Sequence, residues 1–154
     1  MTQFREVILY AEDEETDVLL FQCAFREAGI GHRLVVVPNG KAAIEFLSGA
    51  GAYSDRIRHP LPCLVLLDLN LPGASGLEVL KWIRATPSIC TLATVMLTSS
   101  DQEADIHRAY MQGANGYLVK PGNMEGIVKM ARAIKDYWLG QNRMSAWREV
   151  SQRD

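Results

Sequence analysis

Cysteine is scarce in this chain, and no two cysteines or histidines have the spacing of a metal or redox motif. The three cysteines stand far apart in apolar surroundings and form no CxxC pair, so we interpret them as small buried hydrophobic residues. They are Cys23, Cys63 and Cys90. The three histidines are equally scattered, and we assign them no catalytic role.

The chain also lacks a charge imbalance, a long apolar run, and any repeated or low-complexity segment. It has 16 basic and 18 acidic residues and a formal net charge of −2, which gives no general attraction for nucleic acid or anionic membranes. No stretch approaches the roughly 20 apolar residues of a membrane-spanning helix, and the N-terminus shows no signal-peptide pattern. We therefore expect a cytoplasmic protein with no direct contact to DNA or membrane.

Short apolar runs alternate with helical patterns along the 154 residues, which suffice for one domain with a full core. The predicted strands are 7–11, 34–37, 63–67, 93–98 and 116–120. This alternation predicts an α/β fold, a doubly wound five-stranded parallel sheet with helices on both faces. We place the domain at residues 5–139. A polar C-terminal extension, 140–154, is expected to be either a short docked helix or a frayed tail.

Local signals set the expected ends of the helices. Asn39 begins a turn into the second helix, and residues 75–78 and 100–103 both match the capping box that opens a helix. Asn123 is the expected N-cap of the last helix. Residues 49–62 form a polar loop that contains glycine and proline.

The most informative stretch is 63–76, CLVLLDLNLPGASG. Its apolar run predicts a strand buried on both faces, with Asp68 at the carboxyl end, where open α/β sheets place their ligands. A buried carboxylate is costly unless something compensates it. The ends of the other strands carry Glu12 and Asp13, Thr98, and Lys120.

These polar residues converge because the carboxyl ends of parallel strands share one edge of the sheet. Three carboxylates so close would repel one another, and Mg²⁺, which prefers oxygen ligands, removes that conflict. Lys120 adds a positive charge from the opposite side. The set suits phosphoryl transfer with Asp68 as nucleophile, where Mg²⁺, Lys120 and the Thr98 hydroxyl each neutralise one phosphoryl oxygen.

Together these motifs resemble the receiver domain of two-component response regulators. They are Glu12-Asp13, Asp68 in LLDLNLPGASG, Thr98 in MLTSS, and Lys120-Pro121 in GYLVKP. The resemblance covers about residues 5–138 and implies the flavodoxin-like strand order 2-1-3-4-5. It implies that Asp68 is the phosphoacceptor.

The same resemblance implies the metal ligands and the switch residues. Mg²⁺ would be held by Asp13, Asp68 and the backbone oxygen of Asn70, with Glu12 bound through water. Thr98 and Tyr117 match the switch pair of the family, in which the hydroxyl moves toward the phosphoryl group and the aromatic ring turns inward. From the residues alone, Tyr117 is equally well a core-edge aromatic.

The loop 49–62 and a DYW ending near residue 138 resemble a single-domain subgroup associated with bacterial phytochrome histidine kinases. The sequence departs from the expected pattern at two places. Glu12 replaces the Asp that is commoner in the family, and residues 73–75 replace a charged stretch that is usual in the subgroup. The implied partners are a sensor histidine kinase, a histidine phosphotransfer protein, and a second copy of the chain. The surface expected for the homodimer includes Tyr110, Tyr117, Met130 and Trp138.

Two other functions compete with a phosphorylation switch. A Mg²⁺-dependent phosphohydrolase of the haloacid-dehalogenase kind also uses a strand-end Asp nucleophile, but it needs a second Asp two residues later as general acid and base. Here that position is Asn70, which cannot exchange protons in this range. We therefore expect a phosphoacceptor protein with at most slow self-dephosphorylation, rather than an enzyme. A binding scaffold that works without phosphorylation is the remaining alternative.

Overall fold

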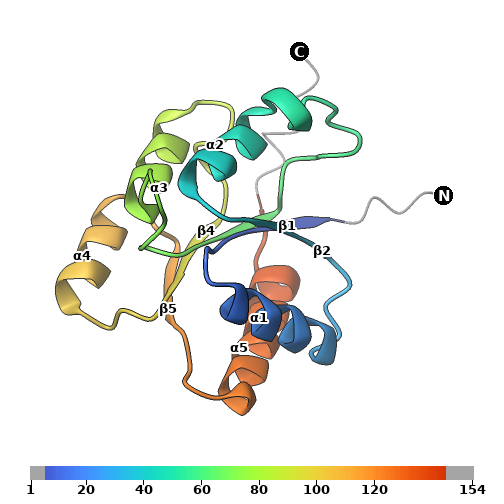
Figure 1. Ribbon diagram of the computed structural model, residues 1–154, viewed down its shortest axis with the longest axis vertical. Helices are drawn as coiled ribbons and strands as arrows, with labels where there is room; N and C mark the ends of the chain where they lie inside the picture. Colours follow the sequence, from blue (N-terminus) through green and yellow to red (C-terminus); the bar gives the residue numbers. More distant parts are fainter. Residues whose placement is uncertain (1–5, 145–154) are drawn as a thin grey trace.

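Five parallel strands form the centre of the molecule, which is a computed structural model with residues 6–144 described (Figure 1). They are β1 (Val7–Ala11), β2 (Arg33–Val37), β3 (Leu64–Leu67), β4 (Thr94–Thr98) and β5 (Gly116–Val119). Their order is β2-β1-β3-β4-β5, and every neighbouring pair is parallel. The predicted fold class and strand order are confirmed. Residue 5 and residues 145–154 lie outside the described residues, so the expected domain limits stay a prediction.

The helices lie on both faces of the sheet. They are α1 (Glu15–Glu27), α2 (Gly40–Ser48), α3 (Gly76–Ala85), α4 (Glu103–Met111) and α5 (Met124–Asp136). α1 and α5 cover one face, whereas α2 and α3 cover the other, with α4 beside them near β5 (Figure 1). A π-helical turn, Tyr137–Gln141, follows α5. None of the helices within residues 6–144 has the length and apolar character to cross a bilayer.

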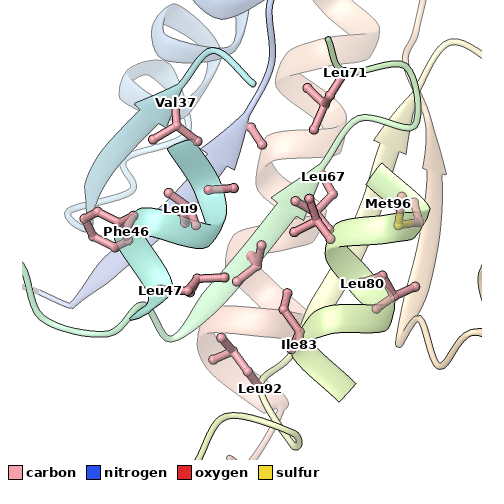
Figure 2. Packing of buried hydrophobic residues seen from close by; sticks show 14 of the residues in the cluster. Leu9, Val37, Phe46, Leu47, Leu67, Leu71, Leu80, Ile83, Leu92 and Met96 are labelled. Atoms are coloured by element: carbon pink, nitrogen blue, oxygen red, sulfur yellow. The ribbon is translucent and has the colours of Figure 1, made fainter. Parts of the chain in front are cut away.

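The core has two layers, because successive strand residues point to opposite faces of the sheet. Along β1, Leu9 contributes to the layer beneath α2 and α3, whereas Ile8 and Tyr10 contribute to the layer beneath α1 and α5. Figure 2 shows the first layer, in which side chains from both helices pack onto the central strands. Those labelled there include Phe46, Leu47, Leu80 and Ile83 from the helices and Leu9, Leu67 and Met96 from the strands. Burial on both faces explains the continuous apolar runs.

The helix N-termini confirm most of the expected caps. Asn39 and Asn123 each accept a backbone N–H bond at 2.8 Å, and Ser75 forms the full reciprocal capping box with Glu78. The capping box expected at residues 100–103 is wrong. α4 begins at Glu103, after Gln102, which provides no side-chain cap, while the Ser100 hydroxyl donates to Asp105 at 2.6 Å.

Two glycines let α2 and α3 begin very close to the loop after β3. A Cβ on Gly76 would lie 2.1 Å from the Asp68 carbonyl oxygen, and one on Gly40 would lie 2.1 Å from the Ala74 carbonyl oxygen. No other residue type fits at either position without moving backbone. The loop that leaves Asp68 is therefore held between the starts of two helices.

One expectation for the surface needs correction. Cys23 is exposed on α1 rather than buried, whereas Cys63 is buried and Cys90 is half-buried. The loop 49–62 contains one short 3₁₀ turn, Gly51–Tyr53. Arg56 donates to the last carbonyl groups of α2, at 2.7 Å to Phe46 and 2.6 Å to Leu47, so the loop is fixed to the end of that helix.

Candidate functional site

Three strand ends bring Glu12, Asp68 and Lys120 together at the carboxyl edge of the sheet. The Lys120 Nζ lies 2.5 Å from Glu12 Oε2 and 3.0 Å from Asp68 Oδ2. The strand order explains these contacts. β3 adjoins β1 directly, and β5 lies two strands from β3, so the long side chain of Lys120 can reach both carboxylates. Sequence reasoning placed these residues at one edge, and the structure puts them in contact.

The three side chains are almost entirely out of water, with 8% of the Lys120 side chain, 8% of Asp68 and none of Glu12 exposed. Burial acts to lower the pKa of Lys120, but hydrogen bonds to the carboxylates outweigh it, and the pKa is raised. Burial likewise acts to raise the pKa of Asp68, yet Glu12 and the Lys120 ammonium hold it below its ordinary value. Asp68 is therefore ionised at neutral pH and is available as a nucleophile.

Glu12 is affected in the opposite direction. Burial raises its pKa to about 7, with the Lys120 hydrogen bond opposing the rise and Asp68 adding to it. A nearby tyrosine hydroxyl, Tyr10, donates to Glu12 Oε2 at 3.4 Å, and burial raises the pKa of that hydroxyl as well. Glu12 is thus the carboxylate whose charge is least well compensated by the protein alone.

The donor set fits a hard divalent cation. Glu12, Asp13 and Asp68 each offer a carboxylate oxygen within 4.8 Å of the other two, and Asp13 is exposed at the mouth of the site. Oxygen donors with an open side toward water are what Mg²⁺ prefers. Asn70 is exposed, and its N–H donates to Asp68 Oδ1 at 3.2 Å. A role for its backbone oxygen in metal binding stays a prediction.

The expected switch residues lie on the neighbouring strands. Thr98 is fully buried at the end of β4, and the register Leu67↔Met96 puts it just beyond Asp68. Tyr117 on β5 is half-buried, and its hydroxyl donates to the Ser100 carbonyl at 2.9 Å. The Tyr117 ring is therefore anchored to the loop that joins Thr98 to α4.

Two residues of the site were missed from the sequence. Asp17 Oδ2 accepts from Lys120 at 2.9 Å, and Tyr10 contacts Glu12 from within β1. Asp17 lies in the first turn of α1, which follows Glu12 and Asp13 directly, so this position beside the acidic pair was the available signal. Tyr10 resembled an ordinary strand residue and gave no such signal.

An α/β sheet with an acidic, lysine-bearing carboxyl edge defines a class of signalling domain, and comparison with known proteins supplies the family. The profile described as Response regulator receiver domain matches residues 8–132. The chain belongs to this family of two-component signalling domains. The response regulator Rcp1 of Synechocystis sp. is 38% identical over 134 residues, which cover 87% of this chain and 89% of Rcp1.

Solved structures give the same relationship. The phosphorylated cyanobacterial phytochrome response regulator RcpA superposes with a TM-score of 0.85 at 31% identity, covering 92% of this chain and 99% of RcpA. RPA3017, a response regulator in red light signaling of R. palustris, superposes at 0.87 with 31% identity and the same coverage. The Mn²⁺-bound form of Rcp1 superposes at 0.82 with 37% identity and again the same coverage. The predicted similarity to phytochrome-associated response regulators is confirmed.

Proposed function

We propose that this protein is a phosphorylation-dependent switch in which Asp68 accepts a phosphoryl group from a sensor histidine kinase. The observation that carries the proposal is the contact of the Asp68 carboxylate with the Lys120 ammonium at 3.0 Å, beside the carboxylates of Glu12 and Asp13. In the transfer, an Asp68 oxygen forms a bond to phosphorus as the bond from phosphorus to the donor imidazole nitrogen breaks. The imidazole then takes a proton from solvent.

Each side chain of the site has a defined part in this transfer. Asp13 and Asp68, with the Asn70 backbone oxygen and with Glu12 through water, would hold Mg²⁺. When bound, the cation neutralises charge on the phosphoryl oxygens. Lys120 holds the Asp68 carboxylate ionised before transfer and can pair with a phosphoryl oxygen after it. In the family, manganese bound to Rcp1 supports a divalent cation here.

We propose that Thr98 and Tyr117 transmit the conformational change that follows phosphorylation of Asp68. A phosphoryl group on Asp68 would attract the Thr98 hydroxyl from the neighbouring strand end. The backbone N–H of Ser100, which donates to Thr98 Oγ1 at 3.4 Å, links that hydroxyl to the loop that also anchors Tyr117. Movement of Thr98 would therefore shift the loop that contacts Tyr117 and leads into α4.

The relatives support a proposal for the phosphoryl donor and for the next protein in the pathway. RcpA is a phytochrome response regulator that has been seen phosphorylated, and RPA3017 belongs to red light signaling. We propose a phytochrome-type histidine kinase as donor, acting in the cytoplasm. The signal would pass on by protein contacts or by transfer to a histidine phosphotransfer protein.

The central test is phosphorylation with Mg²⁺ and acetyl phosphate, followed by intact mass. We expect one acid-stable, base-labile phosphoryl adduct, absent from the Asp68→Asn variant and present in the matched control Asp101→Asn, which changes an exposed residue of the β4–α4 loop. An adduct that persists in Asp68→Asn would contradict the proposal. Rapid turnover of p-nitrophenyl phosphate would favour the phosphohydrolase, and failure to form any adduct would favour the scaffold.

A further inference from the structure

A second cluster of metal-ligating side chains lies at the opposite, amino edge of the sheet. Glu6, His32 and Cys63 each come directly before a strand, namely β1, β2 and β3. These strands are neighbours in the order β2-β1-β3, so their starting residues meet. Backbone bonds fix the three chain segments: Arg33 N–H donates to the Glu6 carbonyl at 3.0 Å, and Cys63 N–H donates to the Val7 carbonyl at 2.8 Å.

The side chains offer a carboxylate oxygen, an imidazole nitrogen and a sulfur. These three atoms all lie within 4.8 Å of one another, and His32 Nε2 is already 3.1 Å from Glu6 Oε2. Tetrahedral zinc, with bonds of about 2.0–2.3 Å, holds its ligand atoms roughly 3.3–3.8 Å apart. The cluster is therefore close to the spacing that zinc needs.

Burial in the cluster increases from Glu6 to Cys63. Cys63 is buried, the His32 side chain is 21% exposed, and that of Glu6 is 60% exposed. His32 also lines an open cavity of about 590 Å³ together with Lys135 and Gly140. An ion can thus reach the cluster from the His32 side, while the sulfur lies on a dry wall of the α1 and α5 layer of the core.

We propose that Glu6, His32 and Cys63 form a zinc site with a fourth position open to water. A thiolate and an imidazole favour zinc and similar transition metals over Mg²⁺, whereas the all-oxygen site at the carboxyl edge favours Mg²⁺. The two edges of the sheet would then bind different metals. This site could not be predicted from the sequence, since its ligands are 26 and 31 positions apart and only the parallel sheet brings them together.

Cobalt is the probe that separates the two sites. Co²⁺ added to the full chain in saturating Mg²⁺ is expected to produce the intense near-ultraviolet band of a thiolate-to-cobalt charge transfer, which an oxygen-only site cannot give. Zn²⁺ should abolish the band at one equivalent per chain. A chain that gives no such band, or a band that Mg²⁺ removes, would overturn the proposal.

Variants assign the band to residues. Cys63→Ser should abolish the band, and His32→Gln and Glu6→Gln should weaken Zn²⁺ binding by more than the roughly 10–100-fold cost of losing an outer-shell partner. Cys23→Ser and His107→Gln are matched controls elsewhere in the chain and should bind as the wild type does. His32→Gln and Glu6→Gln change partly exposed side chains, so they remain informative if Cys63→Ser does not fold. Binding unchanged in both would refute the site.

Discussion

Among the described residues 6–144, Lys120 is the one cation that contacts three carboxylates. Its ammonium group reaches Glu12, Asp17 and Asp68 within 2.5–3.0 Å. Two of these carboxylates are buried, and Lys120 is a positive partner to both. The lysine is therefore a structural counter-ion, and under the proposed function it also pairs with a phosphoryl oxygen.

Replacing Lys120 by Met should destabilise the metal-free protein strongly. Removing one partner of a buried charge group typically costs about 3–5 kcal/mol. Because Mg²⁺ would substitute for the missing positive charge, saturating Mg²⁺ should restore more stability to Lys120→Met than it adds to the wild type. Urea unfolding with and without Mg²⁺ measures both effects, and Lys41→Met at an exposed position is the control. Equal Mg²⁺ effects in the two proteins would contradict this expectation.

The raised pKa of Glu12 predicts a pH dependence in metal-free protein. The folded chain keeps the Glu12 proton up to about pH 7, whereas the unfolded chain releases it near its ordinary value of 4.5. Between these values the folded state binds more protons, so the contribution of Glu12 to the free energy of unfolding falls as pH rises. The Glu12→Gln variant should therefore gain stability relative to wild type from pH 4.5 to pH 7 in the presence of chelator. A difference that stays flat over this window would show that Glu12 is ionised throughout.

The start of α3 lies against Asp68, the proposed phosphoacceptor. Gly76 lies against the Asp68 backbone, where a Cβ would meet the carbonyl oxygen at 2.1 Å. Gly76→Ala should reduce the free energy of unfolding by about 1–3 kcal/mol and slow phosphorylation of Asp68, because the backbone must move. Gly122→Ala is the control, since its Cβ would meet nothing within 4 Å. Denaturant unfolding and the acetyl phosphate reaction test both proteins, and equal behaviour would count against the coupling.

The strands and helices could be predicted from the sequence, but the residues at which the helices begin could be predicted less reliably. Apolar runs located all five strands; β1, β3 and β4 are fully buried and must be continuously apolar, whereas the edge strands β2 and β5 are only partly buried. The capping pattern at 75–78 was right and the same pattern at 100–103 was wrong. Ser100 bonds to Asp105, and its carbonyl accepts the Tyr117 hydroxyl, so tertiary contacts outweigh the local cap there. Glu12, Asp68, Thr98 and Lys120 at the carboxyl edge were predictable for a related reason, since each lies at the end of an apolar strand, whereas Asp17 lies on a helix.

At the scale of the whole molecule, the surface of α4 and β5 is where a second copy is proposed to bind. Of the residues expected there, Tyr110 is exposed, whereas Tyr117, Met130 and Trp138 are half-buried and pack partly against the core. The expected dimer surface stays a prediction. Met111 and Val119 are exposed beside Tyr110, by 75% and 38%. Exposed apolar residues that gather on one face of a protein often mark an interaction site.

Sedimentation equilibrium with and without a phosphoryl donor tests the homodimer. We expect self-association that Met111→Glu weakens by tenfold or more, because a charge at the centre of an apolar contact is not compensated. Ile57→Glu, at an equally exposed residue of the loop 49–62, should leave the association unchanged. A wild-type chain that remains monomeric at high concentration in both states would exclude the dimer.

The separation of the site residues along the chain has a consequence for how the protein is made. Lys120 follows Asp68 by 52 residues and Glu12 by 108. At a synthesis rate of roughly 5–20 residues per second, Lys120 is added to the nascent chain about 3–10 s after Asp68. Until then only dissolved cations can screen the carboxylates. The last strand of the sheet to be translated therefore delivers the charge that completes the site, and a chain stalled before β5 cannot form it.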